Sequence, residues 1–338
     1  MNEAAPSLAH LLRLSDDTGV FEHARGAIPR RHHGYCVDDV ARALLVITRE
    51  PAPTPGLQTL GQRCLAFLSH AQAEDGRFHN RFSYDRRWED TPGTGDWWGR
   101  AVWALGTAAV GHPDAWMREE ALVGFRLGIR QRSPFRRSMA FAALGAAEVV
   151  RADPTAAAAR QLLRDAATAV GRPADDPRWP WPEARLTYAN AVLPDALLAA
   201  GTALGDDRLV ADGLTLLGWL LATETSDGHL SPTPVGGWGP GETRSRYDQQ
   251  PIEAAALAEA CTRAFACSGD PRWLVGIDLA AGWFHGGNDA GVVLLDPSTG
   301  GGYDGLTASG ANTNQGAEST LALIATAQLR HAPARTAR

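Results

Sequence analysis

The densest run of side chains able to take part in chemistry lies at residues 30–44. It contains two adjacent carboxylates, Asp38 and Asp39, followed by Arg42, and histidines precede them. Such groups can transfer protons, hydrogen-bond hydroxyl groups or form ion pairs. Apolar residues at helical spacing follow, so we expect the carboxylates at the start of a helix.

Polar residues open several other predicted helices in the same way, and long loops between the helices add more. Among them, the candidates for catalysis are the carboxylates Asp39, Asp96, Glu183, Asp248 and Glu318. The candidates for substrate binding are His33, Tyr35, Asp38, Arg42, Trp97, Trp98, Arg100, Trp181, Tyr188, Asn190, His229, Trp238, Gln249, Gln250, Glu253, Asn314 and Gln315.

This mixture of carboxylates, amides and aromatic rings suits a sugar. Aromatic faces stack on the C–H surfaces of a pyranose, and carboxylates, amides and guanidinium groups hydrogen-bond its hydroxyls. Two carboxylates at a suitable separation can hydrolyse a glycosidic bond, one as acid and the other as base or nucleophile. In a dry pocket their pKa values would be perturbed, as acid catalysis near neutral pH requires. The pattern therefore predicts a glycoside hydrolase acting on an oligo- or polysaccharide.

Several of these carboxylates also have a purely structural interpretation. Aspartates such as Asp38 and Asp96 are common helix N-caps. The spacings Asp38–Arg42 and Asp96–Arg100 also allow local ion pairs one helical turn apart. Glu318 is harder to explain structurally, because a lone acid near the start of an apolar helix needs a partner or a function.

The sequence gives no indication of a metal or another cofactor, and we expect neither. It has no HExxH motif, no Cys/His cluster, no GxSxG elbow and no phosphate-binding loop. His33 and His229 lie in predicted loops, where hydrogen bonding is the usual role of histidine. We expect free thiols at all four cysteines, Cys36, Cys64, Cys261 and Cys267.

Composition excludes some classes of partner. The chain has 338 residues, a net charge of −6 and 44% hydrophobic residues, which fits a globular protein without a nucleic-acid footprint. No uncharged run reaches the roughly 18 residues of a membrane span. The N-terminal residues lack the basic and apolar regions of a signal peptide. We therefore expect a cytoplasmic protein that binds neither nucleic acid nor membrane.

Helical periodicity dominates the chain. The punctuation by Gly, Pro, Asp and Ser predicts about twelve helices, at residues 4–14, 36–50, 55–73, 95–111, 114–131, 134–151, 155–171, 184–204, 206–224, 249–268, 271–286 and 313–330. Short alternating runs at 77–82 and 291–295 are the best strand candidates.

The connections between these helices alternate between tight and long, with one exception between the fifth and sixth. In antiparallel helix pairs, alternate connections lie at opposite ends of the structure. We therefore predict an all-α (α/α)6 toroid in a single domain spanning residues 1–338. The even-numbered helices, poor in charge beyond their first turns, form the inner ring, and their positive N-termini share one mouth.

Five segments resemble a known family, namely His33–Leu44, Tyr188–Asn190, Ser226–His229, Tyr247–Ala254 and Asn312–Thr320. They are similar to a bacterial all-α domain that occurs alone or appended to retaining group-1 glycosyltransferases. The resemblance spans nearly the whole chain, although Val40 replaces a commoner Asn and Trp97–Trp98 stand where a polar residue or His is usual.

The resemblance implies a glycosidase-like toroid working on an oligo- or polysaccharide, with a glycosyltransferase as a possible neighbour. It does not imply a transferase, since no nucleotide-sugar domain is present. Inversion is the expected stereochemistry, because many toroid glycosidases of this shape invert. Two alternatives remain: a sugar epimerase or polysaccharide lyase on the same fold, and a non-catalytic glycan-binding module.

Overall fold

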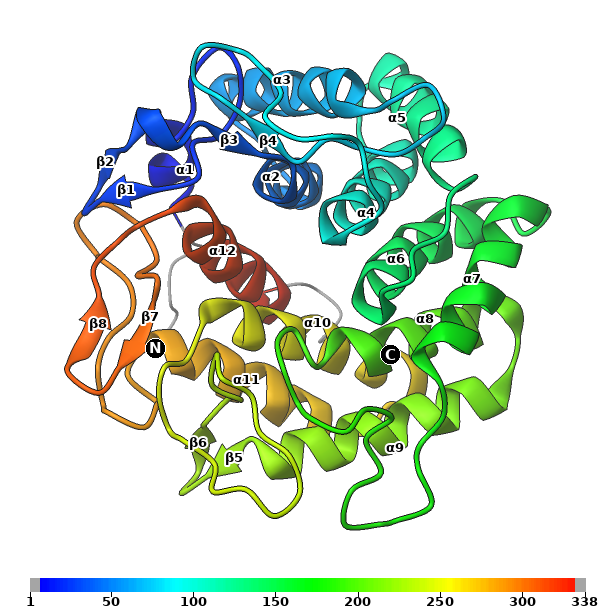
Figure 1. The fold of residues 1–338 in the computed structure, drawn as a ribbon, viewed down its shortest axis with the longest axis vertical. Coiled ribbons are helices and arrows are strands. Elements are labelled where there is room, and N and C mark those ends of the chain that lie inside the picture. Colours follow the sequence, from blue (N-terminus) through cyan, green and yellow to red (C-terminus); the bar gives the residue numbers. More distant parts are fainter. Residues whose placement is uncertain (1–6, 332–338) are drawn as a thin grey trace.

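Helices alternate between an inner and an outer ring along the chain (Figure 1). The computed structural model describes residues 7–331. Within that range, the inner helices are α2 (Val37–Arg49), α4 (Asp96–Gly111), α6 (Arg136–Ala152), α8 (Val192–Leu204), α10 (Pro251–Ser268) and α12 (Ala317–His331). Each packs against the next, and α12 packs against α2 to close the ring. The predicted all-α toroid with even-numbered inner helices is confirmed.

The outer ring consists of the odd-numbered helices, which are α1 (Ala9–Arg13), α3 (Pro55–Ala71), α5 (Ala115–Gly128), α7 (Ala157–Val170), α9 (Asp207–Thr223) and α11 (Arg272–Phe284). The first helix is shorter than the predicted 4–14, whose first residues lie outside the described part of the chain. Local signals begin several of these helices. Thr54 accepts a hydrogen bond from the backbone N–H of Leu57 to cap α3, and Asp206 caps α9.

The inner helices are buried on most sides, and their small side chains let neighbouring helices pack closely. Helices α4 and α6 approach most closely where glycines face each other. A Cβ atom built on Gly106 would lie 2.5 Å from the carbonyl oxygen of Gly145. A Cβ atom on Gly145 would collide with the backbone of Val102. Only glycine allows these backbones to touch, so the spacing of the inner ring depends on both positions.

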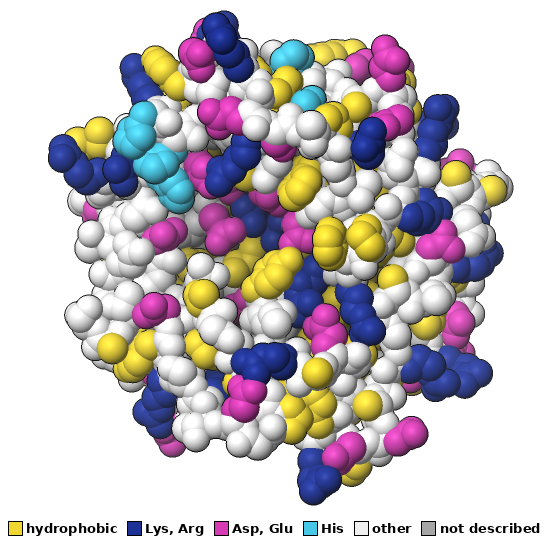
Figure 2. Space-filling view, viewed as in Figure 1, with side chains coloured by type: hydrophobic (Ala, Val, Ile, Leu, Met, Phe, Trp, Pro, Cys, Tyr) yellow, Lys and Arg dark blue, Asp and Glu magenta, His cyan; other side chains and the backbone are white. Residues whose placement is uncertain are grey.

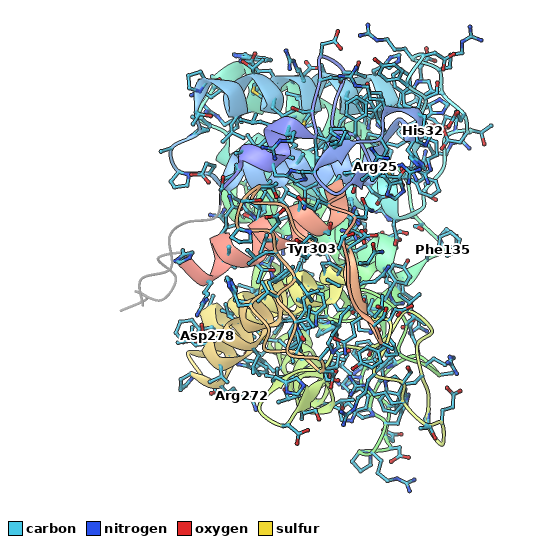
Figure 3. The ribbon with its side chains drawn as sticks, turned by 90° about the vertical axis from the view of Figure 1, so that its left-hand side faces the viewer. Arg25, His32, Phe135, Arg272, Asp278 and Tyr303 are labelled. Atoms are coloured by element: carbon cyan, nitrogen blue, oxygen red, sulfur yellow. The ribbon has the colours of Figure 1, made fainter. Side chains whose placement is uncertain are left out.

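The two ends of the ring differ in the length of their connections, as the sequence predicts. Tight connections lie at one end. Two of them turn at Gly205 and Gly269, whose backbones adopt the left-handed helical conformation. The long connections lie at the other end, which we call the mouth. A side view shows Arg25, His32 and Phe135 at the mouth, whereas Arg272 and Asp278 lie toward the opposite end (Figure 3).

Four short two-stranded ribbons brace the long connections. They pair β1 (Ala24–Arg25) with β2 (Ile28–Pro29), β3 (Tyr35–Cys36) with β4 (Arg81–Phe82), β5 (Thr225–Ser226) with β6 (His229–Leu230), and β7 (Gly305–Thr307) with β8 (Gly310–Asn312). Part of the predicted strand at 77–82 is therefore present as β4. The run at 291–295 forms only isolated bridges.

The eighth helix begins later than the predicted 184–204, at Val192. The preceding residues form a turn in which Ala189 has a φ of 44°. The carboxylate of Glu253 fixes this turn, because its two oxygens accept hydrogen bonds from the backbone N–H groups of Ala189 (2.5 Å) and Asn190 (3.2 Å). A partner from another helix thus holds residues that the local pattern assigns to a helix.

Candidate active site at the mouth of the ring

Carboxylates occupy the first turns of several inner helices at the mouth. Asp38 and Asp39 lie in the first turn of α2, Asp96 in that of α4 and Glu318 in that of α12. The positive end of the helix dipole favours anionic groups there. A space-filling view of this face shows acidic and basic side chains gathered around a central hollow (Figure 2).

Two arginines, the half-buried Arg42 and the buried Arg100, connect these carboxylates across the ring. Arg42 places Nη1 2.6 Å from Oδ1 of Asp39 and Nη2 2.7 Å from Oε2 of Glu318. Arg100 places Nε 3.2 Å from Oδ1 of Asp38. Arg42 therefore joins α2 to α12, and Arg100 joins α4 to α2. The local pairs Asp38–Arg42 and Asp96–Arg100 do not form, because each arginine reaches a different carboxylate.

Asp96 is held by two hydroxyl groups. The hydroxyl of Ser138, in the first turn of α6, donates to Oδ1 of Asp96 at 2.7 Å. The phenol of Tyr188 donates to Oδ2 at 2.5 Å. Both carboxylate oxygens of Asp96 are thus occupied within the protein, whereas Oε1 of Glu318 accepts no hydrogen bond from the described residues. The side chain of Glu318 is also 36% exposed, so it can meet a ligand in the mouth.

Burial changes the proton affinity of the adjacent pair. Burial raises the pKa of Asp39 to about 7; the Arg42 guanidinium opposes that rise, and the negative charges of Glu318 and Asp38 add to it. Burial also raises the pKa of Asp38, against the opposing charges of Arg42 and Arg100. This pair can therefore retain a proton at a pH where an ordinary aspartate has lost it.

Arg137, at the start of α6, fixes the wall that carries Tyr188. Its Nη1 donates to Oε1 of Glu183 at 3.0 Å, and its Nη2 donates to Oδ1 of Asn190 at 3.0 Å. The guanidinium carbon also lies 5.0 Å from the centre of the Tyr188 ring. Glu183 and Asn190, both predicted site residues, are thereby engaged in positioning Tyr188.

Glu253 supports the same wall from below. It is 4% exposed, so its carboxylate serves the backbone turn at residues 188–190. Burial raises its pKa to about 8, and the nearby buried Glu224 adds to the increase, while the two backbone N–H groups oppose it. We infer that Glu253 shapes the site without facing the ligand.

Other predicted binding residues are buried away from the mouth. Tyr35 is 1% exposed and donates to Asp16 at 2.7 Å. Trp98 is fully buried and donates to the carbonyl of Gly128, and Trp181 is 1% exposed. These rings pack in the walls, so we leave them out of the proposed site.

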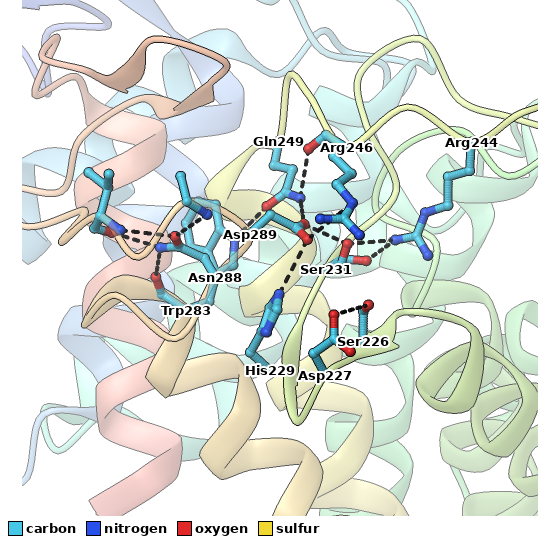
Figure 4. Close-up of polar contacts among 12 residues, drawn as sticks. Ser226, Asp227, His229, Ser231, Arg244, Arg246, Gln249, Trp283, Asn288 and Asp289 are labelled. Atoms are coloured by element: carbon cyan, nitrogen blue, oxygen red, sulfur yellow. Dashed lines mark hydrogen bonds and ion pairs between the residues drawn. The ribbon is translucent and has the colours of Figure 1, made fainter.

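Predicted residues of the 225–249 loop belong to a separate network around Asp289 (Figure 4). The side chain of Asp289 is 1% exposed; it lies 3.2 Å from Nε2 of His229 and accepts a hydrogen bond from Ser231 at 2.6 Å. Gln249 donates to the same carboxylate and accepts from the indole N–H of Trp283 at 2.9 Å. His229 and Gln249 therefore fasten this loop to the segment that follows α11.

The remaining predicted residues have varied positions. Gln315 is buried and donates to Asp296 at 3.0 Å, which ties down a loop. Trp97 donates to the carbonyl of Phe78 at 2.7 Å. Asp248 is exposed and makes no side-chain hydrogen bond to the described residues.

Four more predicted residues lie in or beside the long loops. Trp238 packs edge-on against Trp179 with ring centres 5.2 Å apart. Gln250 is half-buried immediately before α10. Nδ2 of Asn314 lies 3.4 Å from Nδ1 of His23, whose ring packs edge-on against that of His33.

Ser138 and Asp289 are structurally important residues that the sequence analysis did not select. Ser138 follows Arg137 in the first turn of an inner helix, so the rule used for other helix starts could have identified it. No local signal marked Asp289, because its partners lie 40 to 60 residues earlier in the chain.

The inner ring encloses a narrow apolar cavity below the mouth. Arg42 and Arg100 lie among its lining residues, and its volume is about 50 Å³. Such a space holds a few water molecules and is too small for a sugar ring. A sugar would therefore bind above the two arginines, against the carboxylates.

Within residues 7–331, no three or more His, Cys, Asp and Glu side chains are grouped so as to hold a metal ion. None of the helices in that range is both long and apolar enough to cross a membrane. The four cysteines are free.

Comparisons with known proteins place the fold among sugar-processing enzymes. No family model matches the chain, and no curated protein matches it. A sugar epimerase from a ruminal bacterium is similar, with a TM-score of 0.72 at 12% identity, covering 95% of this chain and 94% of that one. The cellobiose 2-epimerase from Spirochaeta thermophila has a TM-score of 0.69 at 13% identity, with 96% and 94% covered.

A glycoside hydrolase has a similar structure as well. The GH76 α-mannanase BT2949 from Bacteroides thetaiotaomicron has a TM-score of 0.64 at 11% identity, covering 96% of this chain and 92% of that one. At these identities the likeness establishes the fold. It leaves the reaction to be argued from the residues at the mouth.

Proposed function

We propose that this protein is a glycoside hydrolase acting on an oligo- or polysaccharide. One observation carries the proposal: within the described residues, four carboxylates from three inner helices lie at the mouth, and only Arg42 and Arg100 form ion pairs with them. At least one carboxyl group is therefore left without a balancing charge. The raised pKa of Asp39 makes the Asp38–Asp39 pair the natural proton carrier.

The proposed roles follow from the raised pKa values of the Asp38–Asp39 pair, whose partly exposed member is Asp38 with a side chain 17% exposed, and from a free oxygen atom on Glu318. The Asp38–Asp39 pair donates a proton to the glycosidic oxygen as the bond from that oxygen to the anomeric carbon breaks. Glu318, with a free Oε1, takes a proton from the water that attacks the anomeric carbon. Asp96 and Tyr188 bind hydroxyl groups beside them. Direct attack by water would invert the anomeric configuration, which NMR of the first product can test.

A sugar epimerase is the second candidate, favoured by one observation. Two of the similar structures are epimerases and match nearly the whole chain. Epimerisation next to a carbonyl requires groups that remove and return a proton at carbon. Within the described residues, the first turns of the six inner helices contain no histidine, and the sequence has no lysine. The histidines near the mouth, such as His33, lie in the loop before α2, so the groups at these first turns are carboxylates, which suit glycoside hydrolysis better.

One experiment separates these candidates. The protein is incubated in D₂O with a panel of oligosaccharides that includes cellobiose and α-mannan fragments, and products are followed by mass spectrometry and NMR. Hydrolysis gives shorter chains, whereas epimerisation keeps the chain length and adds deuterium at C2. Binding without turnover would contradict both and favour a glycan-binding module that partners a glycosyltransferase.

Variants then test the residues. We expect Asp39→Asn and Glu318→Gln each to lower kcat about 10²–10⁴-fold, the usual contribution of a positioned acid or base. Asp175→Asn is a matched control, because Asp175 is exposed and outside the site. If both site variants keep full turnover of a cleaved glycan, the acid and base are wrongly placed.

A further inference from the structure

The proposed reaction leaves one strongly charged feature at the mouth unexplained. Residues 23–33, which we call the basic hairpin, comprise β1, β2 and the short 3₁₀ turn η1 (Arg31–His33). The segment contains no acidic residue and six basic or titratable ones, His23, Arg25, Arg30, Arg31, His32 and His33. Such a concentration is unusual in a chain of net charge −6.

The arginines of the basic hairpin lack acidic partners. Arg25, Arg30 and Arg31 form no ion pair or side-chain hydrogen bond with the described residues, and the three are exposed. Arg31 has only a distant contact with the Phe21 ring, at 6.0 Å. Elsewhere at the mouth arginines are paired, as Arg81 is with Glu22. Three guanidinium groups are therefore free to bind an anion from solution.

The histidines are crowded in the same place. The ring centre of His33 lies 4.2 Å from that of His32 and 4.8 Å from that of His23. Burial lowers the pKa of His33, the positive charges of His32, His23 and Arg30 lower it further, and Glu22 opposes them. The one carboxylate beside this cluster, Glu22, lies 3.8 Å from Nε2 of His23 and is shared with Arg81, so positive groups outnumber it on the rim.

The basic hairpin is in direct contact with the proposed site. The backbone N–H of Ala24 donates to Oδ1 of Asn314 at 2.9 Å, and the N–H of Gln315 donates to the carbonyl of Gly26 at 3.3 Å. These two residues immediately precede α12, which carries Glu318. In the side view, Arg25 and His32 lie at the mouth end (Figure 3), so a chain leaving the carboxylates on this side passes over them.

We propose that the basic hairpin binds anionic substituents of an acidic glycan whose neutral sugar ring occupies the mouth. The excess of carboxylates at the mouth repels an anionic ring there, while the unpaired guanidinium groups on the rim attract one further along the same chain. This inference rests on the proposed action on a glycan. It adds that the substrate alternates neutral and acidic units or carries acidic branches.

Binding of oligosaccharides of about six units that alternate glucuronate with a neutral N-acetylhexosamine is the direct test, with their methyl esters as the uncharged counterpart. We expect the acid to bind and the ester to bind at least tenfold more weakly. The triple variant Arg25→Gln/Arg30→Gln/Arg31→Gln should lose about tenfold in affinity for the acid, as expected for three exposed charge contacts. The loss should vanish in 0.5 M salt.

A charge-matched control removes three arginines from the groove between α7 and α9, as Arg160→Gln/Arg164→Gln/Arg208→Gln. It should leave affinity unchanged, since the net charge falls equally but the rim is intact. Equal binding of acid and ester, equal loss in both triple variants, or anionic phospholipid vesicles binding the rim as tightly as the acid would overturn the proposal.

The two proposals can fail separately. If Glu318→Gln abolishes cleavage of a glycan but the hairpin variant changes neither binding nor cleavage of any acidic glycan, only the hairpin proposal fails. If the hairpin variant weakens binding of the alternating acidic oligosaccharide while no glycan is hydrolysed by the unmodified protein, only the hydrolase proposal fails.

Discussion

Asparagine at position 39 should change how the stability of this protein depends on pH. Asp39 is 3% exposed, and burial raises its pKa from an ordinary value of 3.8 to about 7. Each unit of pKa is worth about 1.4 kcal/mol, so ionising Asp39 costs about 4 kcal/mol more in the folded chain than in the unfolded one.

The sign follows from the two pKa values. Below pH 4 the carboxyl is protonated in both states and carries no such cost. As the pH rises from about 4 through 7, the unfolded state releases its proton first, so the free energy of unfolding falls. Above pH 7 the loss is complete. Asparagine cannot ionise, so the variant should not lose this stability.

Urea unfolding at pH values from 4 to 8, followed by tryptophan fluorescence, measures the effect. The unfolding free energy of Asp39→Asn minus that of the unmodified protein should increase by about 4 kcal/mol from pH 4 to pH 8. Other titrating groups largely cancel in this difference. Asp175→Asn, which changes an exposed carboxylate, should give a curve parallel to that of the unmodified protein. A parallel curve for Asp39→Asn as well would refute the assignment of a proton-retaining carboxyl at the mouth.

Three further substitutions test the supports of the site. Glu253→Ala leaves two buried backbone N–H groups without acceptors. The free energy of unfolding, measured by chemical denaturation, should therefore fall by about 2–6 kcal/mol. An unchanged value would mean that water replaces the carboxylate. Gly145→Ala forces α4 and α6 apart and should cost at least about 1–3 kcal/mol, seen as a lower thermal midpoint. Gly282→Ala, in helix α11 with nothing within 4 Å of the added Cβ, should cost less. Tyr188→Phe removes the hydroxyl that donates to Asp96. The kcat/KM on a cleaved glycan should fall about 3–10-fold, as for a single net hydrogen bond, while stability is nearly unchanged. An unchanged kcat/KM would show that Tyr188 is not part of the site.

The geometry of the ring was predictable because its signals are local. Apolar spacing, N-terminal caps and the alternation of tight and long connections are all properties of neighbouring residues. They place Asp38, Asp39, Asp96 and Glu318 at helix starts that share one end. The same reasoning failed at residues 184–191, where Glu253, more than 60 residues away, holds a turn.

The sequence also did not predict which way adjacent side chains point. Trp97 and Trp98 differ by about 100° around a helix, and the pattern gave no reason to assign them different surroundings. In the structure one is half-buried and bonded to Phe78, while the other is fully buried in the core. Trp98 is the ring that packs against the outer helix α5, where its indole N–H donates to the carbonyl of Gly128.

The sequence by itself determined which residues lie at the mouth, because helix periodicity and helix ends depend on short segments of neighbouring residues. Only the tertiary structure decided which of them touch. Arg42 was within reach of Asp38 along its own helix, yet it binds Asp39 and Glu318, the latter 276 residues later. That choice depends on the closure of α12 against α2, which brings Glu318 to Arg42.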